Sequence, residues 1–127
     1  MHRGVRVATR VMLAVAVVAL AIAARRQFGI GVVGSGSMWP ALIPGDAVVF
    51  ERGARPDVGD MLVYDKPGWP EGVVHRVVRR LEKGAVRTKG DANPIPDLDP
   101  VQRTAIRGKV VAVVPFGRVV ALATGRR

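Results

Sequence analysis

The hydrophobic positions divide the chain into two parts with different patterns. Residues 11–24 read VMLAVAVVALAIAA, fourteen residues without a charged or polar side chain. As a helix this run is about 21 Å long. A bilayer core needs roughly 20 apolar residues, and the run reaches that length if it begins at Val5 and the side chains of Arg6 and Arg10 extend to the interface. After Arg26 the pattern changes to short valine-rich runs separated by Gly, Pro and Asp, which is typical of strands and turns.

The apolar run fits three kinds of segment. Arginines on both sides favour a membrane anchor. A basic start and the small-x-small triplet at 21–23 also fit a cleaved signal peptide, and a buried core helix is the third alternative. Three arginines precede the run and two follow it, a difference too small to orient it in a membrane. We expect residues 1–26 to form a basic segment with a membrane anchor helix, and residues 27–127 to form a β-rich domain.

Six valine-rich runs in the second part predict strands. They cover residues 30–34, 47–51, 61–64, 73–79, 85–89 and 106–114. Turn signals rich in Gly, Pro and Asp separate them at 44–46, 56–59, 67–72, 82–84 and 92–100. The last nine residues, VVALATGRR, fit a strand, a helix or a membrane-contacting tail equally well. The pattern therefore predicts a mainly β fold behind one N-terminal apolar helix.

Composition narrows the classes of function. The chain has no cysteine, which excludes disulfide scaffolds, cysteine proteases, zinc fingers and iron–sulfur sites. Its net charge is +10, set by 16 arginines against 4 lysines, and such a balance favours anionic partners, either nucleic acid or an acidic lipid surface. Only six aromatic residues and no recognisable nucleic-acid motif accompany the charge, which argues against nucleic acid.

The chain has only two serines and two histidines, so few residues can act as a hydroxyl nucleophile or as an imidazole base. Both serines lie in the segment GSGSMWP at 34–40, where glycines allow a nucleophile to be presented at the end of a strand, although the same composition fits a flexible connector. His75 lies in the predicted strand 73–79, and alternation puts it on one face with Val73 and Val77. It fits either an ordinary half-buried histidine or a general base, provided that a carboxylate fixes its tautomer.

A third segment, TKGDANPIPDLDP at 88–100, holds three of the ten acidic residues. Its three prolines reduce the entropy of holding the carboxylates in place, although Asp, Asn and Pro are also common in ordinary surface turns. The glycine and terminal glutamate spacing of a calcium loop is missing. We therefore expect no metal site.

Taken in order, these three segments resemble the type I signal peptidases. The resemblance covers about residues 31–114 and is closest to the branch shared by the endoplasmic reticulum, archaea and some bacteria, where histidine replaces the lysine base. It implies that Ser37 is the nucleophile and His75 the general base. In this branch the orienting acid lies six positions beyond the Gly-Asp of the third segment, which gives Asp97, with Asp91 as second and Asp99 as third candidate.

The resemblance also implies an oxyanion hole made by the Ser37 backbone N–H and the Ser35 hydroxyl. By the same analogy, the segment 30–34 pairs with an extended substrate, and Trp39 stands where a glutamate is frequent, which suits a membrane interface. The implied fold is a small antiparallel β catalytic domain of the type that signal peptidases share with the self-cleaving repressors of the SOS response. Those repressors use a lysine base, but Lys89 lies beside the acidic loop and not in the strand that should carry the base.

The implied function is a membrane-anchored serine endopeptidase that removes N-terminal signal peptides from exported preproteins and cleaves after small residues. We expect no cofactor, preprotein signal peptides and membrane lipids as partners, and no nucleic acid. The expected location is the cell membrane, single-pass, with the catalytic domain on the extracytoplasmic side. Three alternatives stay open: an inactive peptidase-like membrane protein, a peptidase for dedicated substrates, and a basic protein that binds membrane or nucleic acid. Any need for partner subunits is also open.

Overall fold

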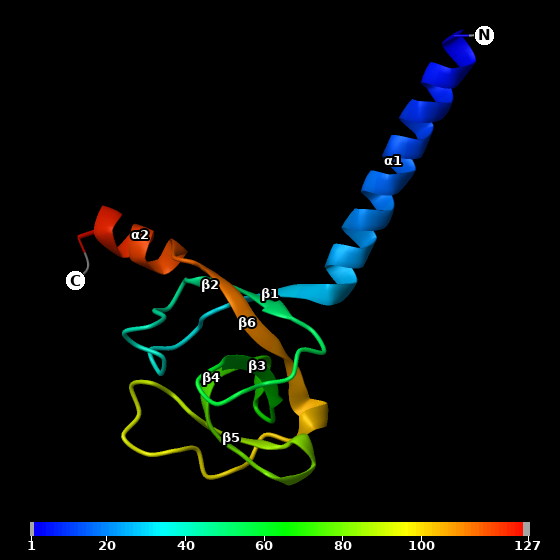
Figure 1. The fold of residues 1–127 in the computed structure, drawn as a ribbon. Helices are drawn as coiled ribbons and strands as arrows, with labels where there is room; N and C mark the ends of the chain where they lie inside the picture. The colour runs from blue at the N-terminus through cyan, green and yellow to red at the C-terminus, as the bar shows by residue number, and fades with distance from the viewer. Residues whose placement is uncertain (1, 126–127) are drawn as a thin grey trace.

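A long N-terminal helix stands clear of a small β domain in the computed structural model, which describes residues 2–125 (Figure 1). This helix, α1 (His2–Gln27), has 26 residues and is about 39 Å long. It is long and apolar enough to cross a bilayer, and none of its residues is buried against the domain. The alternative of a core helix is therefore wrong, because a core helix buries at least one face.

The domain is a six-stranded antiparallel sheet in the order β1-β2-β6-β3-β4-β5. The valine-rich runs predicted six strands, and the family resemblance implied that the domain is antiparallel; the strand order was not predicted. A short helix, α2, follows the last strand, and two 3₁₀ turns, η1 (Glu82–Gly84) and η2 (Arg103–Ala105), connect strands. The bounds are β1 (Phe28–Val32), β2 (Ala47–Glu51), β3 (Met61–Lys66), β4 (Trp69–Arg80), β5 (Val86–Lys89), β6 (Ile106–Val114) and α2 (Phe116–Ala123). Because β6 pairs with both β2 and β3, the N-terminal and central strands form one sheet.

Two elements differ from the sequence-based expectation. The segment 67–72 was expected to be a turn, but β4 already begins at Trp69, and only Pro67 and Gly68 make the turn. The β3–β4 pairing extends to Lys66 and Trp69, so cross-strand hydrogen bonds prevail over a Pro- and Gly-rich composition. The strand expected at 30–34 is β1, which lies two residues earlier because it pairs with β2 from Phe28 to Val32. The described part of the C-terminal tail forms α2 and the turn after it.

Two clusters of buried hydrophobic residues form the core of the domain. The first contains Val33, Met38, Leu42, Val48, Phe50 and Val63. The second contains Leu62, Tyr64, Val77, Val86 and Val101. Met38 is 1% exposed and directly follows Ser37, while Val77 is 1% exposed and lies two residues beyond His75. Each cluster thus anchors one of the two segments that the sequence singles out for chemistry.

The turn at Gly45 and Asp46 ties the loop after β1 to the start of α2. Asp46 is fully buried; its Oδ1 accepts the Gly117 N–H at 2.9 Å, and its Oδ2 accepts the Ile43 N–H at 3.0 Å. The Asp46 carbonyl also accepts the Val33 N–H at 2.8 Å. A carboxylate at the first turn of a helix satisfies N–H groups that have no partner within the helix. A buried aspartate therefore joins its own turn to the residue after β1 and to the start of α2.

Candidate active site

Ser37 lies in the loop between β1 and β2, held at both ends. Val33 pairs its backbone with the turn at 45–46, and Met38 inserts its side chain into the first core cluster. Between these anchors the residues 34–36 are exposed, and Ser37 is half-buried. The Ser37 hydroxyl is therefore presented at the surface by a loop whose ends are fixed by packing and backbone hydrogen bonds.

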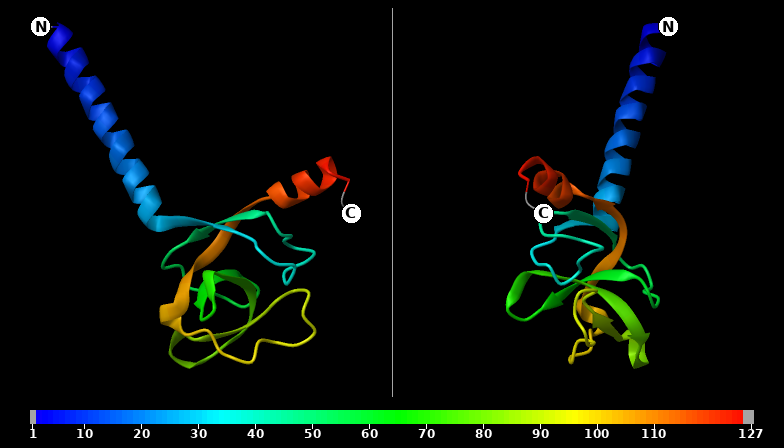
Figure 2. Two further views of the ribbon diagram at one scale, coloured as in Figure 1. Left: turned by 180° about the vertical axis from the view of Figure 1, so that it is seen from behind. Right: turned by 90° about the vertical axis from the view of Figure 1, so that its left-hand side faces the viewer.

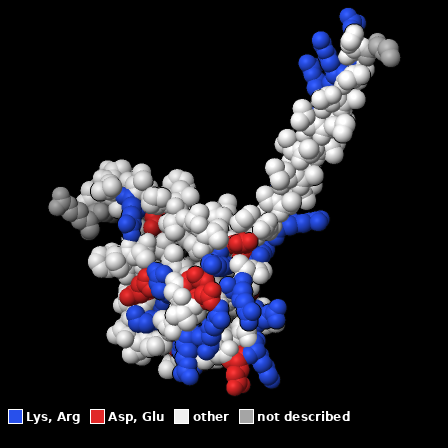
Figure 3. All heavy atoms as spheres, viewed as in Figure 1, with Lys and Arg blue, Asp and Glu red and all other residues white. Residues whose placement is uncertain are grey.

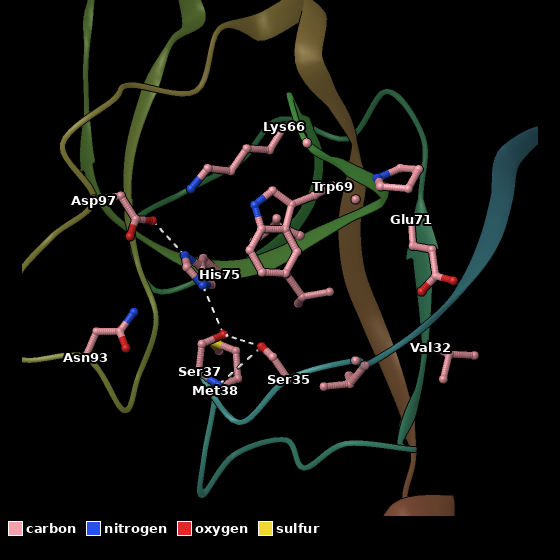
Figure 4. A pocket seen from close by; sticks show the side chains of 17 residues that line it. Val32, Ser35, Ser37, Met38, Lys66, Trp69, Glu71, His75, Asn93 and Asp97 are labelled. Atoms are coloured by element: carbon pink, nitrogen blue, oxygen red, sulfur yellow. Dashed lines mark hydrogen bonds and ion pairs between the residues drawn. The ribbon is translucent and has the colours of Figure 1, made fainter.

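His75 lies on β4 between Ser37 and Asp97 (Figure 4). Its Nε2 is 3.1 Å from Ser37 Oγ, and its Nδ1 is 2.6 Å from Asp97 Oδ2. An Nδ1–H that donates to the carboxylate leaves the Nε2 lone pair free to accept the Ser37 Oγ–H. The structure brings the three residues into one hydrogen-bonded chain of serine, imidazole and carboxylate, which is the geometry that activates a hydroxyl for attack on a carbonyl.

Asp97 is held in place by the strand beside it. The Thr88 hydroxyl donates to Asp97 Oδ2 at 2.7 Å, and the Asp97 N–H donates to the Thr88 carbonyl at 2.8 Å. Arg87 Nη1 donates to the carbonyls of Asp97 and Leu98 at 2.9 and 2.7 Å. Burial raises the pKa of Asp97, but hydrogen bonds from His75 and Thr88 outweigh it and hold the pKa below its usual value. The carboxylate is therefore ionised when the imidazole gains a proton.

Asp91 and Asp99, the other two candidates for the orienting acid, lie elsewhere. Arg76 donates to both carboxylate oxygens of Asp91, from Nε at 2.9 Å and from Nη2 at 2.8 Å. The hydrogen bonds from Arg76 hold the pKa of Asp91 below its usual value. Asp99 is exposed. Of the three carboxylates, Asp97 is the one hydrogen-bonded to His75.

The segment that carries Asp91 packs against the serine loop. The Ala92 N–H donates to the Ser37 carbonyl at 2.9 Å, and the Asp91 N–H points to Met38 Sδ at 3.4 Å. Gly90 packs against Ser37 and His75. A Cβ added at Gly90 would lie 2.7 Å from the Ser37 carbonyl oxygen and 3.1 Å from His75 Nε2. The absence of a side chain at Gly90 thus allows the third segment to pack directly against the backbone of Ser37.

Lys89, the basic residue of the repressor alternative, does not reach the serine. Its Nζ donates to the Gly90 carbonyl at 3.3 Å. Among residues 2–125, the basic group hydrogen-bonded to Ser37 Oγ is the imidazole of His75.

Ser35 lies beside Ser37. The two hydroxyl oxygens are 3.1 Å apart, and the Ser37 N–H donates to Ser35 Oγ at 3.4 Å. Asn93 approaches the same space from the third segment, and its side-chain amide borders the cleft (Figure 4). Ser35 and Asn93 thus both line the cleft beside Ser37, and each carries a group that can donate a hydrogen bond.

A cleft of about 480 Å³ opens in front of Ser37 and His75. One wall is the end of β1 and the loop that carries Ser37, where each of the residues 32–38 except Gly36 lines the cleft. The other wall is the β3–β4 hairpin with residues 72–75. β5 pairs with β4 only from Arg76 to Arg80, so β5 does not cover the edge of β4 at residues 71–75. Trp69 stands over the cleft from the hairpin (Figure 4).

Sequence reasoning missed four residues around the site: Lys66, Trp69, Tyr64 and Thr88. Lys66 and Trp69 line the cleft from the hairpin that was expected to be a turn. The Tyr64 hydroxyl lies 3.3 Å from His75 Nδ1, and burial raises the pKa of Tyr64 to about 12. Alternation within each strand was visible, but which strands pair, and in which register, was not. That pairing is what brings these side chains to His75.

Comparison with curated proteins finds relatives that share much of this chain. The signal peptidase complex catalytic subunit SEC11 of Clavispora lusitaniae is 38% identical over 109 residues, which are 76% of this chain and 66% of the relative. SEC11 of Candida tropicalis is 42% identical with the same coverage. SEC11 of Lodderomyces elongisporus is 42% identical over 83 residues, 62% of this chain and 50% of the relative.

The chain thus spans between half and two thirds of the length of these relatives. No protein-family model matches it. The relatives and the order of the serine, histidine and acidic segments agree on one assignment. The chain belongs to the type I signal peptidase family, in its endoplasmic-reticulum-type branch.

Proposed function

We propose that this protein is a membrane-anchored serine endopeptidase that removes N-terminal signal peptides from exported preproteins. The observation that carries the proposal is the hydrogen-bonded chain from Ser37 Oγ through His75 to Asp97 Oδ2. The relatives' name, signal peptidase complex catalytic subunit, supports the reaction and the substrate class.

In this proposal Ser37 Oγ attacks the carbonyl carbon of the scissile peptide bond while His75 Nε2 takes the hydroxyl proton. Asp97 stabilises the imidazolium that forms. The Ser37 N–H exchanges its long contact with Ser35 Oγ, at 3.4 Å, for the oxyanion of the tetrahedral intermediate, and the Ser35 hydroxyl donates to the same oxyanion. His75 then gives its proton to the leaving amine. Water, activated by the same imidazole, releases the peptide from the acyl-enzyme and restores the Ser37 hydroxyl.

The cleft supports an extended substrate. A peptide lying between the end of β1 and the edge of β4 at 71–75 would exchange backbone hydrogen bonds with the enzyme and present one carbonyl to Ser37. The walls beside the serine are apolar, with Val33, Met38 and Val74 among the lining residues. Shallow apolar walls favour small side chains, which supports cleavage after small residues.

The proposed placement puts the active site next to the bilayer. Both α1 and α2 leave the same end of the domain (Figures 1 and 2). Large apolar side chains are exposed there on β1, at Ile30 and Val32, and on α2, at Val119 and Leu122. Most charged side chains of the domain lie away from this end in the view of Figure 3. An apolar end beside a spanning helix suits contact with the lipid interface, and Trp39, which is 61% exposed, suits the same region.

We infer a single-pass location in the cell membrane, with the domain on the extracytoplasmic side. An exported chain presents its cleavage site where it emerges from the membrane, so a peptidase of this class must work on that side. Protease protection of the domain in sealed, inverted and right-side-out vesicles measures the orientation. Protection of the domain in right-side-out vesicles would contradict the inference.

The proposal is tested with the full-length protein in liposomes and a model preprotein, with the product identified by mass spectrometry. We expect cleavage after a small residue by the wild type and none by Ser37→Ala. His75→Ala should lose as much as Ser37→Ala, because members of a triad act as a unit. Lys89→Ala is the matched control and should keep activity. Turnover by His75→Ala at the wild-type rate would refute the assignment of the base.

The relatives are named as subunits of a complex, so the same assay also decides whether this chain works alone. A folded wild-type protein that cleaves no general substrate should next be tested on precursors from its own genome and with membrane extract. Cleavage under those conditions would establish a dedicated substrate or a required partner. Continued failure would establish an inactive, peptidase-like protein.

A further inference from the structure

Tyr64, the one tyrosine of the chain, is buried beside the His75–Asp97 pair, and the mechanism above does not use it. Its side chain is 4% exposed, and its ring meets the His75 ring edge-on, with centroids 6.2 Å apart and planes at 73°. The hydroxyl lies 3.3 Å from His75 Nδ1, 3.4 Å from Thr88 Oγ1 and 3.5 Å from Asp97 Oδ2. A polar atom at this depth needs a hydrogen-bond partner.

Strand register explains why these groups meet. On β3 and β4, Leu62 lies opposite His75 and Tyr64 lies opposite Val73, so Tyr64 is a diagonal neighbour of His75 on one face. On β4 and β5, Thr88 lies opposite Val77, which makes Thr88 the diagonal neighbour of His75 on its other side. Two hydroxyls therefore flank the imidazole from the adjacent strands, and both reach the carboxylate that it binds.

The protons around Asp97 Oδ2 can be assigned by elimination. At 2.6 Å the Nδ1 atom must carry the proton of its bond to the carboxylate, so it cannot accept one from Tyr64. The Thr88 hydroxyl donates its proton to Oδ2 at 2.7 Å. The Tyr64 proton is left with Oδ2 itself or with the lone pairs of Thr88 Oγ1. By either route the donation ends on the same carboxylate oxygen.

We propose that Tyr64 is a positioning residue: its hydroxyl, together with that of Thr88, holds Asp97 Oδ2 against His75 Nδ1 and keeps the imidazole in the Nδ1–H tautomer. Burial raises the pKa of Tyr64 to about 12, so the hydroxyl stays protonated and remains a donor at neutral pH. In the opposite tautomer the Nδ1 lone pair would face the carboxylate, and Nε2 would carry a proton where it must accept one from Ser37. The tautomer that Tyr64 favours is the one that can act as a base.

The kinetic part of this inference rests on the proposed peptidase function. Tyr64→Phe removes one oxygen and keeps the ring in the second core cluster. We expect kcat to fall about 3- to 10-fold, as for the loss of one modest hydrogen bond, with KM unchanged because Tyr64 does not line the cleft. Thr88→Val should lower kcat further, because the Thr88 hydroxyl lies closer to Asp97 Oδ2 than the Tyr64 hydroxyl does. Thr88→Ser should keep most of the wild-type kcat.

A second readout does not need activity. Histidine-selective ¹⁵N labelling of the full chain in detergent micelles gives signals from His2 and His75 only, and His2→Gln identifies those of His75. In the wild type we expect the Nδ1–H tautomer, with its proton exchanging slowly with water. In Tyr64→Phe we expect faster exchange of this proton and a partial shift toward the Nε2–H tautomer. Thr88→Ser should restore the wild-type signature that Thr88→Val loses.

Val86→Ala is the matched control, because Val86 lies in the same core cluster and makes no polar contact with the site. It should lower the melting temperature without changing the His75 spectrum or kcat. Equal spectral changes in Tyr64→Phe and Val86→Ala would show a merely structural role and overturn the proposal, as would an unchanged spectrum in Tyr64→Phe. A wild-type protein that cleaves nothing would count against the peptidase function, while the spectra would still decide the role of Tyr64.

Discussion

Replacing Gly90 by alanine tests how closely the third segment packs against Ser37, the proposed nucleophile. The φ of Gly90 lies outside the left-handed region, so alanine can adopt this backbone conformation and any effect must come from contacts. The new Cβ would lie 2.7 Å from the Ser37 carbonyl oxygen and from Asn93 Nδ2, and 3.1 Å from His75 Nε2. Ordinary contact begins at 3.4 Å, so the serine backbone or the third segment must move by about 0.7 Å.

That displacement changes the hydrogen bond between Ser37 and His75 on which the proposed reaction depends. Ser37 Oγ and His75 Nε2 are 3.1 Å apart, and a misplacement of about 1 Å at a reacting centre costs on the order of 100-fold in rate. We therefore expect Gly90→Ala to lower kcat by about 10- to 100-fold. The free energy of unfolding should fall by about 0–2.6 kcal/mol, because overpacking costs about 1–3 kcal/mol while alanine recovers about 0.4–1 kcal/mol from the unfolded state.

The assay is the steady-state cleavage of a model preprotein, accompanied by thermal unfolding followed by circular dichroism. Gly36→Ala is the control, because a Cβ there meets no atom within 4 Å and Gly36 does not line the cleft. The kcat of Gly36→Ala should stay within about threefold of the wild-type value, which is the size of effect expected for a substitution at an exposed position. If Gly90→Ala kept kcat within about twofold of the wild type, the residues around the new Cβ would have moved without disturbing the Ser37–His75 hydrogen bond. That result would refute the reasoning from close packing.

Three further predictions concern the carboxylates and α2. Asp97→Asn should lower kcat/KM by about 10³-fold or more, as expected for loss of the orienting carboxylate. Asp99 is exposed, so Asp99→Asn should have the wild-type kcat/KM. Equal activity of Asp97→Asn and the wild type would assign the orienting role to another acid. Because Arg76 depresses the pKa of Asp91, this pair stabilises the folded state at neutral pH, and the contribution disappears as the pH falls below 3.8. Melting curves of Asp91→Asn should thus lie below those of the wild type at pH 7 and merge with them in acid, and a constant difference would contradict the ion pair. Gly117→Ala would place a Cβ 2.3 Å from the Pro44 carbonyl oxygen, so denaturant titration should show a loss of about 1–3 kcal/mol, and an unchanged midpoint would contradict the close packing of α2.

The local pattern of the chain was enough to predict the main elements. Fourteen consecutive apolar residues predicted the N-terminal helix, and the valine-rich runs at 47–51 and 106–114 match β2 and β6. The scarcity of serine and histidine limited the candidates for nucleophile and base to a few residues. These are properties of single segments, where periodicity and residue type decide the outcome.

The choice among the three acidic residues could not be made from their own segment. The resemblance to a family favoured Asp97, but spacing alone left Asp91 and Asp99 open. In the folded chain Arg76 binds Asp91, while Arg87 and Thr88 hold Asp97 against His75. The partners come from other strands, so strand pairing decides which carboxylate meets the imidazole.

The same holds for Tyr64 and Asp46, which looked ordinary along the sequence. Tyr64 reaches His75 only because β3 and β4 pair in one register, and a shift by one residue would turn it to the opposite face. Asp46 caps α2 from 71 positions away. The sequence by itself determined the elements and the reactive groups, because these depend on neighbours along the chain. Tertiary structure alone decided which groups are buried together, because hydrogen bonds and packing between distant segments set the register.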